Sequence, residues 1–330
     1  MTTEAIVPSD VALTHIDLQL PPGQPFSSNI MAIDQAAHRL YFANRTKVGV
    51  DVIDISKPVG QYLLTVPTGS PTNGVTVAPD LHRAYAGLAD STVAVIDTDP
   101  ASATYQTVIA RPNTGGEKRA DEMDYDPLHQ QLWVGNSDDG FITVIDAHTN
   151  EVIARIDDLG PGVEQPRFNP VDGMVYLVVN GTNRLFQFDP VRLVTSHVWD
   201  VEDACSANGL AINEHTNQAL LGCSARSGYP HAALWDFATE RVVETFPQVG
   251  FGNTTIYDSV IDQFLFASRL DDKPVIGMYS GSPVRFLTCV SAGARGGGSV
   301  AYDQTNGRVY TQDTRPGSEG LVSFPLPTAR

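Results

Sequence analysis

The sequence predicts an all-β fold, a seven-bladed β-propeller, and three observations carry this prediction. The same pattern returns seven times: a short apolar strand, a turn residue and, seven positions later, an aromatic residue or Leu that opens a second apolar strand. Successive turn positions are 43 to 48 residues apart, a period typical of propeller blades when each repeat contains only strands. The last repeat lacks a fourth strand, and the start of the chain offers one. The turn positions are Asp34, Ala78, Asp126, Asn169, Asn213, Asp258 and Asp303.

The second repeat shows how one blade is built. Residues 74–78 (GVTVA) alternate and are rich in β-branched residues, which favours an innermost strand. Pro79-Asp80 makes the turn that follows. The next strands are expected at residues 84–88 (AYAGL), 92–97 (TVAVID) and 104–110 (TYQTVIA).

The same order of elements returns along the chain. Third strands are expected at VDVID, ITVID, LFQFD and ALWDF, which are residues 50–54, 142–146, 185–189 and 233–237. Outermost strands are expected at QYLLTVP, EVIARI, LVTSHVW, RVVETF and VRFLTC, which are residues 61–67, 151–156, 193–199, 241–246 and 284–289.

The last repeat contains only three strands, at residues 299–303, 308–312 and 321–325. The missing outer strand is available at residues 13–21 (LTHIDLQLP). Pairing this N-terminal strand with the last blade closes the ring and removes two open sheet edges. Because no linker or shift in composition interrupts the repeats, we expect residues 1–330 to form one domain.

The composition limits the function classes. Hydrophobic residues make up 42% of the chain and charged residues 18%, which suits a large core. The net charge of −17 argues against nucleic acid as a partner, because phosphates require a basic face. No signal peptide or membrane-spanning segment is visible, so we expect a cytoplasmic protein with no membrane partner. The oligomeric state is left open.

Residues 71–97 (PTNGVTVAPDLHRAYAGLADSTVAVID) resemble the YVTN-type propeller repeat, in which a strand, a turn and a strand are followed by a "TVxVID" strand. The resemblance covers nearly the whole chain and is strongest in the first three repeats. It implies the fold and not the function, because that family includes enzymes, binding proteins and proteins of unknown role.

The repeat also identifies residues that converge on the central axis. The residue five positions before each turn position is equivalent from blade to blade, so these residues should surround one mouth of the central channel. Six of the seven carry an amide or a carboxylate, and none is basic. We call this set the mouth ring: Asn29, Asn73, Asp121, Glu164, Asn208, Asn253 and Gly298.

A ring of carboxylate and amide oxygens suits a hard divalent cation, Ca²⁺ or Mg²⁺. Asp121 and Glu164 lie on adjacent blades and would repel each other unless a cation or a proton lay between them. The mouth ring is similar to the calcium sites of six-bladed lactonase and phosphotriesterase propellers. That resemblance implies a metal-dependent enzyme whose small-molecule substrate is most simply a lactone or ester to be hydrolysed. Glu122 would be the general base, and a lyase or cyclase reaction is the alternative.

Further candidates lie in the loops around the same mouth. Arg119, Arg295 and Arg226 could bind an anionic group of a substrate together with Asn136. His231, which we expect in a loop on this face, is a second candidate for acid–base catalysis. The other cations at this mouth could bind an anionic group in the same way: Arg45, Lys118, Arg269 and Arg315. Further polar loop residues there are Asn44, Asp138, Asn180, Tyr229 and Asp313.

The three cysteines do not suggest a disulfide framework, so Cys205 and Cys223 are expected as buried or loop thiols on one blade. A rival function comes from a different class: a non-catalytic propeller that binds a peptide or protein on its top face. An exposed aromatic patch on that face would favour the rival, and a bound metal would favour the enzyme.

Overall fold

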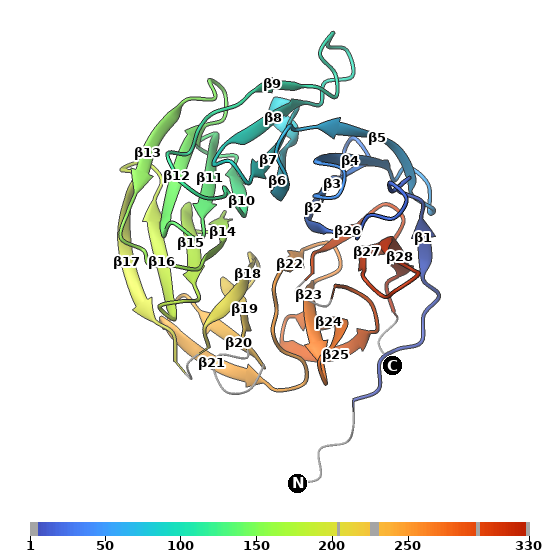
Figure 1. Ribbon diagram of the computed structural model, residues 1–330. Helices are drawn as coiled ribbons and strands as arrows, with labels where there is room; N and C mark the ends of the chain where they lie inside the picture. Colours follow the sequence, from blue (N-terminus) through green and yellow to red (C-terminus); the bar gives the residue numbers. More distant parts are fainter. Residues whose placement is uncertain (1–5, 203–204, 225–230, 295–297, 328–330) are drawn as a thin grey trace.

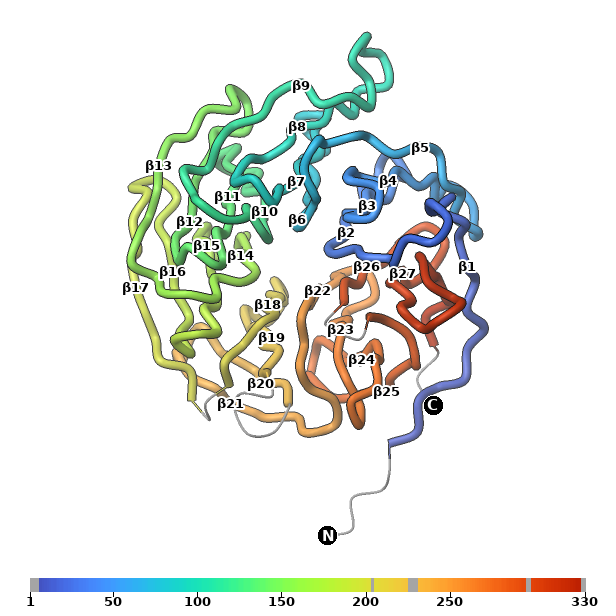
Figure 2. The backbone as a smooth tube through the Cα atoms, viewed as in Figure 1, coloured from blue at the N-terminus to red at the C-terminus, as the bar shows by residue number. Residues whose placement is uncertain are grey.

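The computed structural model describes residues 6–202, 205–224, 231–294 and 298–327. These residues form seven four-stranded antiparallel sheets arranged as blades around a central axis (Figure 1). In blades 1 to 6 the strand nearest the axis comes first along the chain, and the path then moves outward, as the backbone trace shows (Figure 2). The predicted seven-bladed propeller is therefore confirmed.

The first three blades contain β2 to β13 and one short 3₁₀ helix. Blade 1 consists of β2 (Ser28–Asp34), β3 (Arg39–Asn44), β4 (Gly49–Asp54) and β5 (Gln61–Pro67). Blade 2 consists of β6 (Thr72–Ala78), β7 (Arg83–Leu88), β8 (Val93–Asp97) and β9 (Val108–Ala110), with the helix η1 (Pro79–Leu81) in its first turn. Blade 3 consists of β10 (Met123–Asp126), β11 (Gln131–Asn136), β12 (Phe141–Asp146) and β13 (Val152–Ile156).

The next three blades follow the same plan. Blade 4 consists of β14 (Val163–Asn169), β15 (Met174–Val179), β16 (Arg184–Asp189) and β17 (Val194–Asp200). Blade 5 consists of β18 (Ala207–Asn213), β19 (Gln218–Cys223), β20 (His231–Asp236) and β21 (Arg241–Phe246). Blade 6 consists of β22 (Thr255–Asp258), β23 (Gln263–Leu270), β24 (Lys273–Gly281) and β25 (Val284–Val290).

Blade 7 closes the ring with a strand from each end of the chain. Its inner strands are β26 (Val300–Asp303), β27 (Arg308–Asp313) and β28 (Gly320–Pro325), and its outermost strand is β1 (Thr14–Ile16). The register pairs Thr14 with Ser323 and Ile16 with Leu321. The predicted pairing of the N-terminal strand with the last blade is confirmed, and it covers the edge of β28.

The core lies between the blades. Seven clusters of buried apolar residues each draw on two neighbouring blades, and the cluster that joins blade 7 to blade 1 also contains Ile16 and Leu18. The aromatic residue or Leu that opens the second strand of each repeat is buried in every blade. These residues are Tyr41, Tyr85, Trp133, Tyr176, Leu220, Leu265 and Tyr310.

The turn residues of the repeat hold the turns at the opposite end of the inner strands. In blade 3, Asp126 Oδ1 accepts hydrogen bonds from the main-chain N–H groups of Leu128 and His129 at 2.8 and 3.1 Å. Asx side chains stabilise turns in this way, which explains their recurrence at this position. No helix among the described residues is long and apolar enough to cross a membrane.

Candidate functional site

Each mouth-ring position of blades 1 to 6 lies at a β-bulge at the start of the inner strand. The register of the two innermost strands shifts at Asn29, Asn73, Glu164 and Asn208. In blade 3, the main-chain groups of Gly135 pair with both Asp121 and Glu122, at 2.9 Å each. In blade 6, those of Ala267 pair with both Asn253 and Thr254, at 2.9 Å each. A bulge bends the strand and redirects its side chains, so the shared offset in the sequence corresponds to one local geometry.

One side of the mouth ring is organised by two arginines. Arg45 of blade 1 donates from Nε and Nη2 to Asn73 Oδ1 at 3.1 and 2.6 Å. Asn73 Nδ2 in turn donates to the main-chain oxygen of Ala120 in blade 3 at 3.2 Å. Arg119 Nη2 lies 3.0 Å from Asp121 Oδ2. Hydrogen bonds therefore run from blade 1 through blade 2 to blade 3 across the mouth.

Burial and charge oppose each other at Asp121. Its side chain is buried, which raises the pKa of the carboxyl above its usual value, while the nearby Arg119 and Arg45 lower it. Burial also lowers the pKa of the Arg45 guanidinium, against the raising effect of Asp121. The two arginines thus place positive charge beside a carboxylate that is largely shielded from water.

The other side of the mouth ring is organised by an amide. Asn180, at the end of β15, donates from Nδ2 to Glu164 Oε1 at 3.0 Å and to Asn208 Oδ1 at 2.7 Å. This side chain joins blade 4 to blade 5. Asn253 Nδ2 reaches the main-chain oxygen of Gly298 in blade 7 at 3.5 Å. Glu164 Oε1 and Asn208 Oδ1 thus share one amide donor, Asn180 Nδ2.

Glu122 lies between the two sides, one residue beyond Asp121, and its side chain is buried. Burial raises the pKa of its carboxyl well above the usual value, and the negative charges of Glu164 and Asp121 raise it further. Arg167 and Arg119 oppose this rise. The balance of these effects keeps the Glu122 carboxyl protonated to a higher pH than a carboxyl in water.

Glu122 also lines a cavity of about 310 Å³ in the channel. Apolar residues of the inner strands form much of its wall, and Asp124 and Arg167 add charge. Burial raises the pKa of Asp124, against the lowering effect of Arg167 and of the hydrogen bond from the Phe168 main-chain N–H at 2.9 Å. The cavity thus combines apolar side chains with polar and ionisable groups at defined positions, as small-molecule sites commonly do.

Two side chains of blade 4 tie the inner strands together below the mouth. Gln165 Oε1 accepts hydrogen bonds from the main-chain N–H groups of Leu210 and Thr255 at 3.1 and 3.2 Å, which joins blades 4, 5 and 6. Arg167 Nη1 donates to the main-chain oxygen of Pro166 at 2.8 Å, and Nη2 lies 3.5 Å from that of Thr255. These contacts fix the strands that carry Glu164 and Asn208.

The donor set does not fit the expected cation between Asp121 and Glu164. Arg119 and Arg45 already engage Asp121 and Asn73, and a guanidinium at that distance repels a divalent cation. Within the described residues, the only three His, Cys, Asp or Glu ligand atoms that lie within 4.8 Å of one another belong to Cys205, Cys223 and His231. A cation held by the whole mouth ring would have to displace both arginines.

The residues expected to bind a substrate lie in different surroundings. Arg119 lies at the mouth, where its side chain is 38% exposed. Asn136 is fully buried inside blade 3, where it accepts a hydrogen bond from Thr114 Oγ1 at 2.6 Å and donates to Thr143 Oγ1 at 3.1 Å. It therefore has no surface on which to bind a substrate. Arg226 and Arg295 lie outside the described residues.

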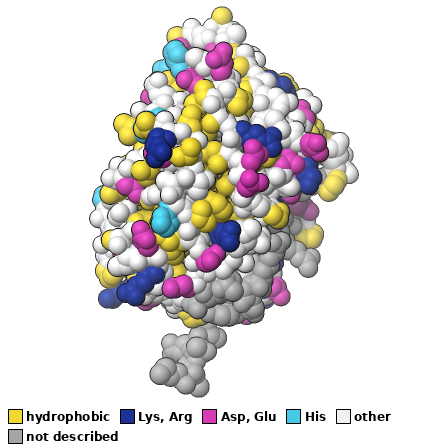
Figure 3. All heavy atoms as spheres, turned by 90° about the vertical axis from the view of Figure 1, so that its left-hand side faces the viewer, with side chains coloured by type: hydrophobic (Ala, Val, Ile, Leu, Met, Phe, Trp, Pro, Cys, Tyr) yellow, Lys and Arg dark blue, Asp and Glu magenta, His cyan; other side chains and the backbone are white. Residues whose placement is uncertain are grey.

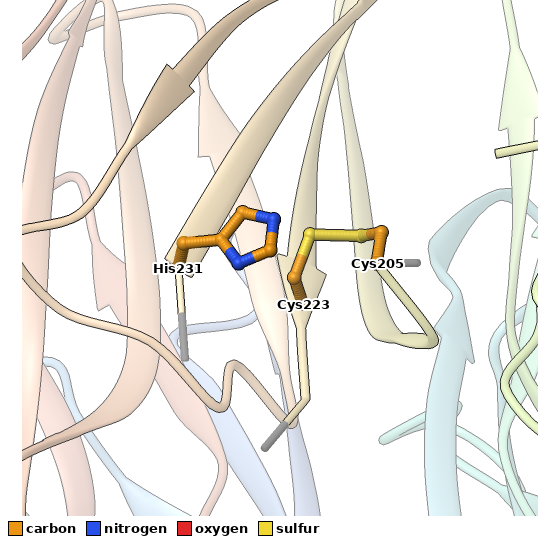
Figure 4. A group of neighbouring side chains, drawn as sticks. All are labelled: Cys205, Cys223 and His231. Atoms are coloured by element: carbon orange, nitrogen blue, oxygen red, sulfur yellow. A yellow bond between two sulfur atoms is a disulfide. The ribbon is translucent and has the colours of Figure 1, made fainter. Parts of the chain in front are cut away.

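Two expectations about blade 5 are wrong. His231 does not lie in a loop: it is the first residue of β20 and is fully buried. Cys205 and Cys223 are not thiols but form a disulfide, and His231 lies beside it (Figure 4). Disulfides persist mainly in oxidising compartments, so the cytoplasmic location stays a prediction.

The sequence predicted Asn180 at the mouth without a role and Arg45 as one of the cations that could bind an anionic group, and it gave no prediction for Asp124 and Arg167. The repeat contained a signal for the missed pair. Asp124 and Arg167 each lie three residues after the mouth-ring position of their own blade. The same counting that found Asp121 and Glu164 could have found them on adjacent inner strands.

No family model matches the chain, and no curated protein matches it. Among solved structures, the chain is similar to a chain in the crystal structure of the mitotic checkpoint complex, with a TM-score of 0.74 and 15% sequence identity. The match covers 99% of this chain and 95% of that chain. At this identity the similarity shows the fold alone. The resemblance to YVTN-type repeats stays a prediction, and the comparisons support a β-propeller that has seven blades in this chain.

Proposed function

We propose that the protein is an enzyme that binds a small organic molecule at the mouth ring and uses Glu122 and Glu164 as an acid–base pair. The simplest reaction is hydrolysis of an ester or lactone, and a lyase or cyclase reaction on the same groups is the alternative. The observation that carries the proposal is the buried Glu122 carboxyl, whose pKa is raised by burial and by the charge of Glu164.

The two glutamates suit opposite roles. A carboxyl held neutral by burial donates a proton to an oxygen of the substrate, while a neighbouring carboxylate accepts one from water. Glu164 is only partly buried, and Asn180 holds its Oε1 at 3.0 Å. When two adjacent carboxyls lie in different environments, one suits the role of the acid and the other that of the base.

Arg119 supplies a positive charge near the pair. Its guanidinium is partly exposed at the mouth and is paired with Asp121. Such a group stabilises the negative charge that develops on a carbonyl oxygen during ester hydrolysis. Asn208 and Asn253 are partly exposed, and their amides orient polar groups of the substrate, whereas Asn73 is buried and bonded to Arg45 and Ala120. No step of this proposal requires a metal ion.

The rival, a propeller that binds peptides through exposed aromatic residues, has less support. Among the described residues, the large hydrophobic side chains that are exposed are Val, Leu and Ile, and none is aromatic. Several of them lie on outer strands, such as Val152 and Ile153 of β13 and Val194 and Val198 of β17. On this side of the ring, apolar side chains are interspersed with charged ones (Figure 3).

The test is turnover of a panel of chromogenic esters and lactones, measured across the pH range. We expect Glu122→Gln to lower kcat/KM by about 100-fold or more, the usual contribution of a positioned acid or base. Glu151→Gln, which changes an exposed glutamate of blade 3, is the matched control and should leave kcat/KM unchanged. Equal activity of Glu122→Gln and wild type would contradict the role of Glu122. Failure of wild type to turn over any ester or lactone would contradict the hydrolase form of the proposal.

A further inference from the structure

Three ligand-bearing side chains lie in a row across blade 5, away from the mouth ring. Cys223, the last residue of β19, is paired in register with His231, the first residue of β20. On the other side of β19, Cys205 precedes β18, and its main-chain oxygen accepts a hydrogen bond from Ser224 at 3.0 Å. Neighbouring strands thus bring Cys205, Cys223 and His231 onto one face of the sheet (Figure 4).

The ligand atoms of these three residues lie within 4.8 Å of one another, and all three side chains are fully buried. Two thiolates and an imidazole are preferred ligands of zinc, and atoms bound to one tetrahedral zinc lie about 3.3–3.8 Å apart. The three side chains therefore need only small movements to share one ion. Cys205 and Cys223 pack in the apolar cluster between blades 4 and 5 with Val178 and Trp235, which excludes competing ligands.

We propose that Cys205, Cys223 and His231 form a redox-controlled zinc site: the disulfide is its metal-free state, and reduction creates the site. An external thiol or phosphine reductant supplies two electrons that break the S–S bond, and two protons complete the two thiols. Zn²⁺ then binds both sulfurs and one ring nitrogen of His231, and the two thiol protons leave to solvent. These three ligands leave the fourth position of the tetrahedron open.

The backbone favours reversible exchange between the two states. The Cα atoms of Cys205 and Cys223 are 4.5 Å apart, and β18 and β19 hold them in place through the pairing of Ala207 with Cys223. Reduction of the disulfide therefore leaves two thiols next to each other and does not release them into separate segments. Cys289 of β25 is the contrast: it is a buried thiol outside this group.

The experiment compares oxidised and reduced full-length protein. Treatment of the folded chain with a phosphine, followed by removal of the phosphine and thiol titration in denaturant, should raise the number of thiols from one to three, since Cys289 is the free cysteine. The reduced protein should then bind one Zn²⁺ per chain in competition with a chromogenic chelator. Substituted Co²⁺ should show thiolate-to-cobalt charge-transfer absorption, a readout that needs no variant. The oxidised protein should show neither.

Variants assign the ligands. Cys205→Ser and Cys223→Ser should abolish the charge-transfer band of one thiolate each and weaken Zn²⁺ binding. His231→Asn should weaken it by more than the roughly 10- to 100-fold that loss of an outer-shell partner costs. Cys289→Ser is the control and should bind as wild type does, with circular dichroism confirming the fold of each variant. Three outcomes would overturn the proposal: a disulfide that resists reduction in the folded chain, reduced wild type without micromolar Zn²⁺ affinity, or Co²⁺ spectra without thiolate bands.

Discussion

The Arg119 guanidinium lies 3.0 Å from the carboxylate of Asp121, a member of the mouth ring, which itself contains no basic residue. This ion pair limits the ability of Asp121 to bind a cation. A carboxylate that a guanidinium neutralises is a poor ligand for a divalent cation, because the cation must first displace the guanidinium.

We therefore predict that wild type binds Ca²⁺ no more tightly than about 1 mM, the range of weak protein sites. Arg119→Gln should increase the affinity, since it leaves Asp121 without its counter-ion. Arg184→Gln is the matched control, because the Arg184–Asp200 pair is exposed, with 49% and 84% of the two side chains accessible. Calorimetric titration measures all three proteins. Micromolar binding by wild type would contradict the view that the arginines exclude the cation.

Closure of the ring gives a second prediction. Removal of residues 6–21 deletes β1 and exposes the edge of β28, and it also removes Ile16 and Leu18 from the core. Burial of such side chains contributes about 1.5–3 kcal/mol each, so the truncated protein should melt at a clearly lower temperature. Ile16→Ala should show part of this loss, about 2–5 kcal/mol. His15→Ala, at an exposed position of the same strand, is the control. An unchanged melting temperature of the truncated protein would contradict closure by β1.

The third prediction concerns the contact between blades 2 and 3. A Cβ atom at Gly74 would overlap the main-chain oxygen of Asp121, which cannot move without shifting the bulge. Gly74→Ala should lower the free energy of unfolding by about 1–3 kcal/mol, the usual effect of overpacking. At Gly135, by comparison, the nearest atom to an added Cβ is 3.2 Å away, so Gly135→Ala should have a smaller effect. Urea unfolding compares them, and the opposite order would show that Gly74 does not limit the approach of the blades.

The sequence was sufficient to predict the seven blades and the closing strand, because the repeat records turns and buried positions directly. It was also sufficient to find the mouth ring, since an equal offset produced an equal bulge at Asn29, Asn73, Glu164 and Asn208. The repeat does not show which side chain forms a hydrogen bond with each mouth-ring residue. Arg45 of blade 1 donates a hydrogen bond to Asn73 of blade 2, and the distance between these two side chains depends on how the blades pack against each other.

In blade 5, neither the disulfide nor the position of His231 was predicted from the sequence. Cys205 and Cys223 lie at similar distances before and after the turn at Asn213, so the register of the hairpin could have suggested a disulfide. The prediction of two separate thiols did not use this register. His231 was placed in a loop because β20 begins two residues before the strand expected at residues 233–237, and its first residue is a buried polar one.

The fourth prediction is a pH dependence of stability. Glu122 has a folded-state pKa above its unfolded value, so its contribution to stability is fully present below the unfolded pKa. That contribution is lost as the pH rises through the raised folded pKa. Glu122→Gln cannot ionise, so its stability relative to wild type should improve as the pH increases from about 5 to about 9. Glu151→Gln should show no such trend. Urea unfolding across this range gives the comparison, and a constant difference between Glu122→Gln and wild type would show that Glu122 ionises normally.

The measurement that tests the account most directly is the infrared difference spectrum between wild type and Glu122→Gln at neutral pH. The account requires the Glu122 carboxyl to hold its proton there, because burial and the charges of Glu164 and Asp121 disfavour the carboxylate. Wild type should therefore show the C=O absorption of a protonated carboxylic acid that the variant lacks, and this absorption should disappear at alkaline pH. Spectra that differ only in carboxylate absorption at neutral pH would show an ionised Glu122 and would contradict the proposed acid–base pair.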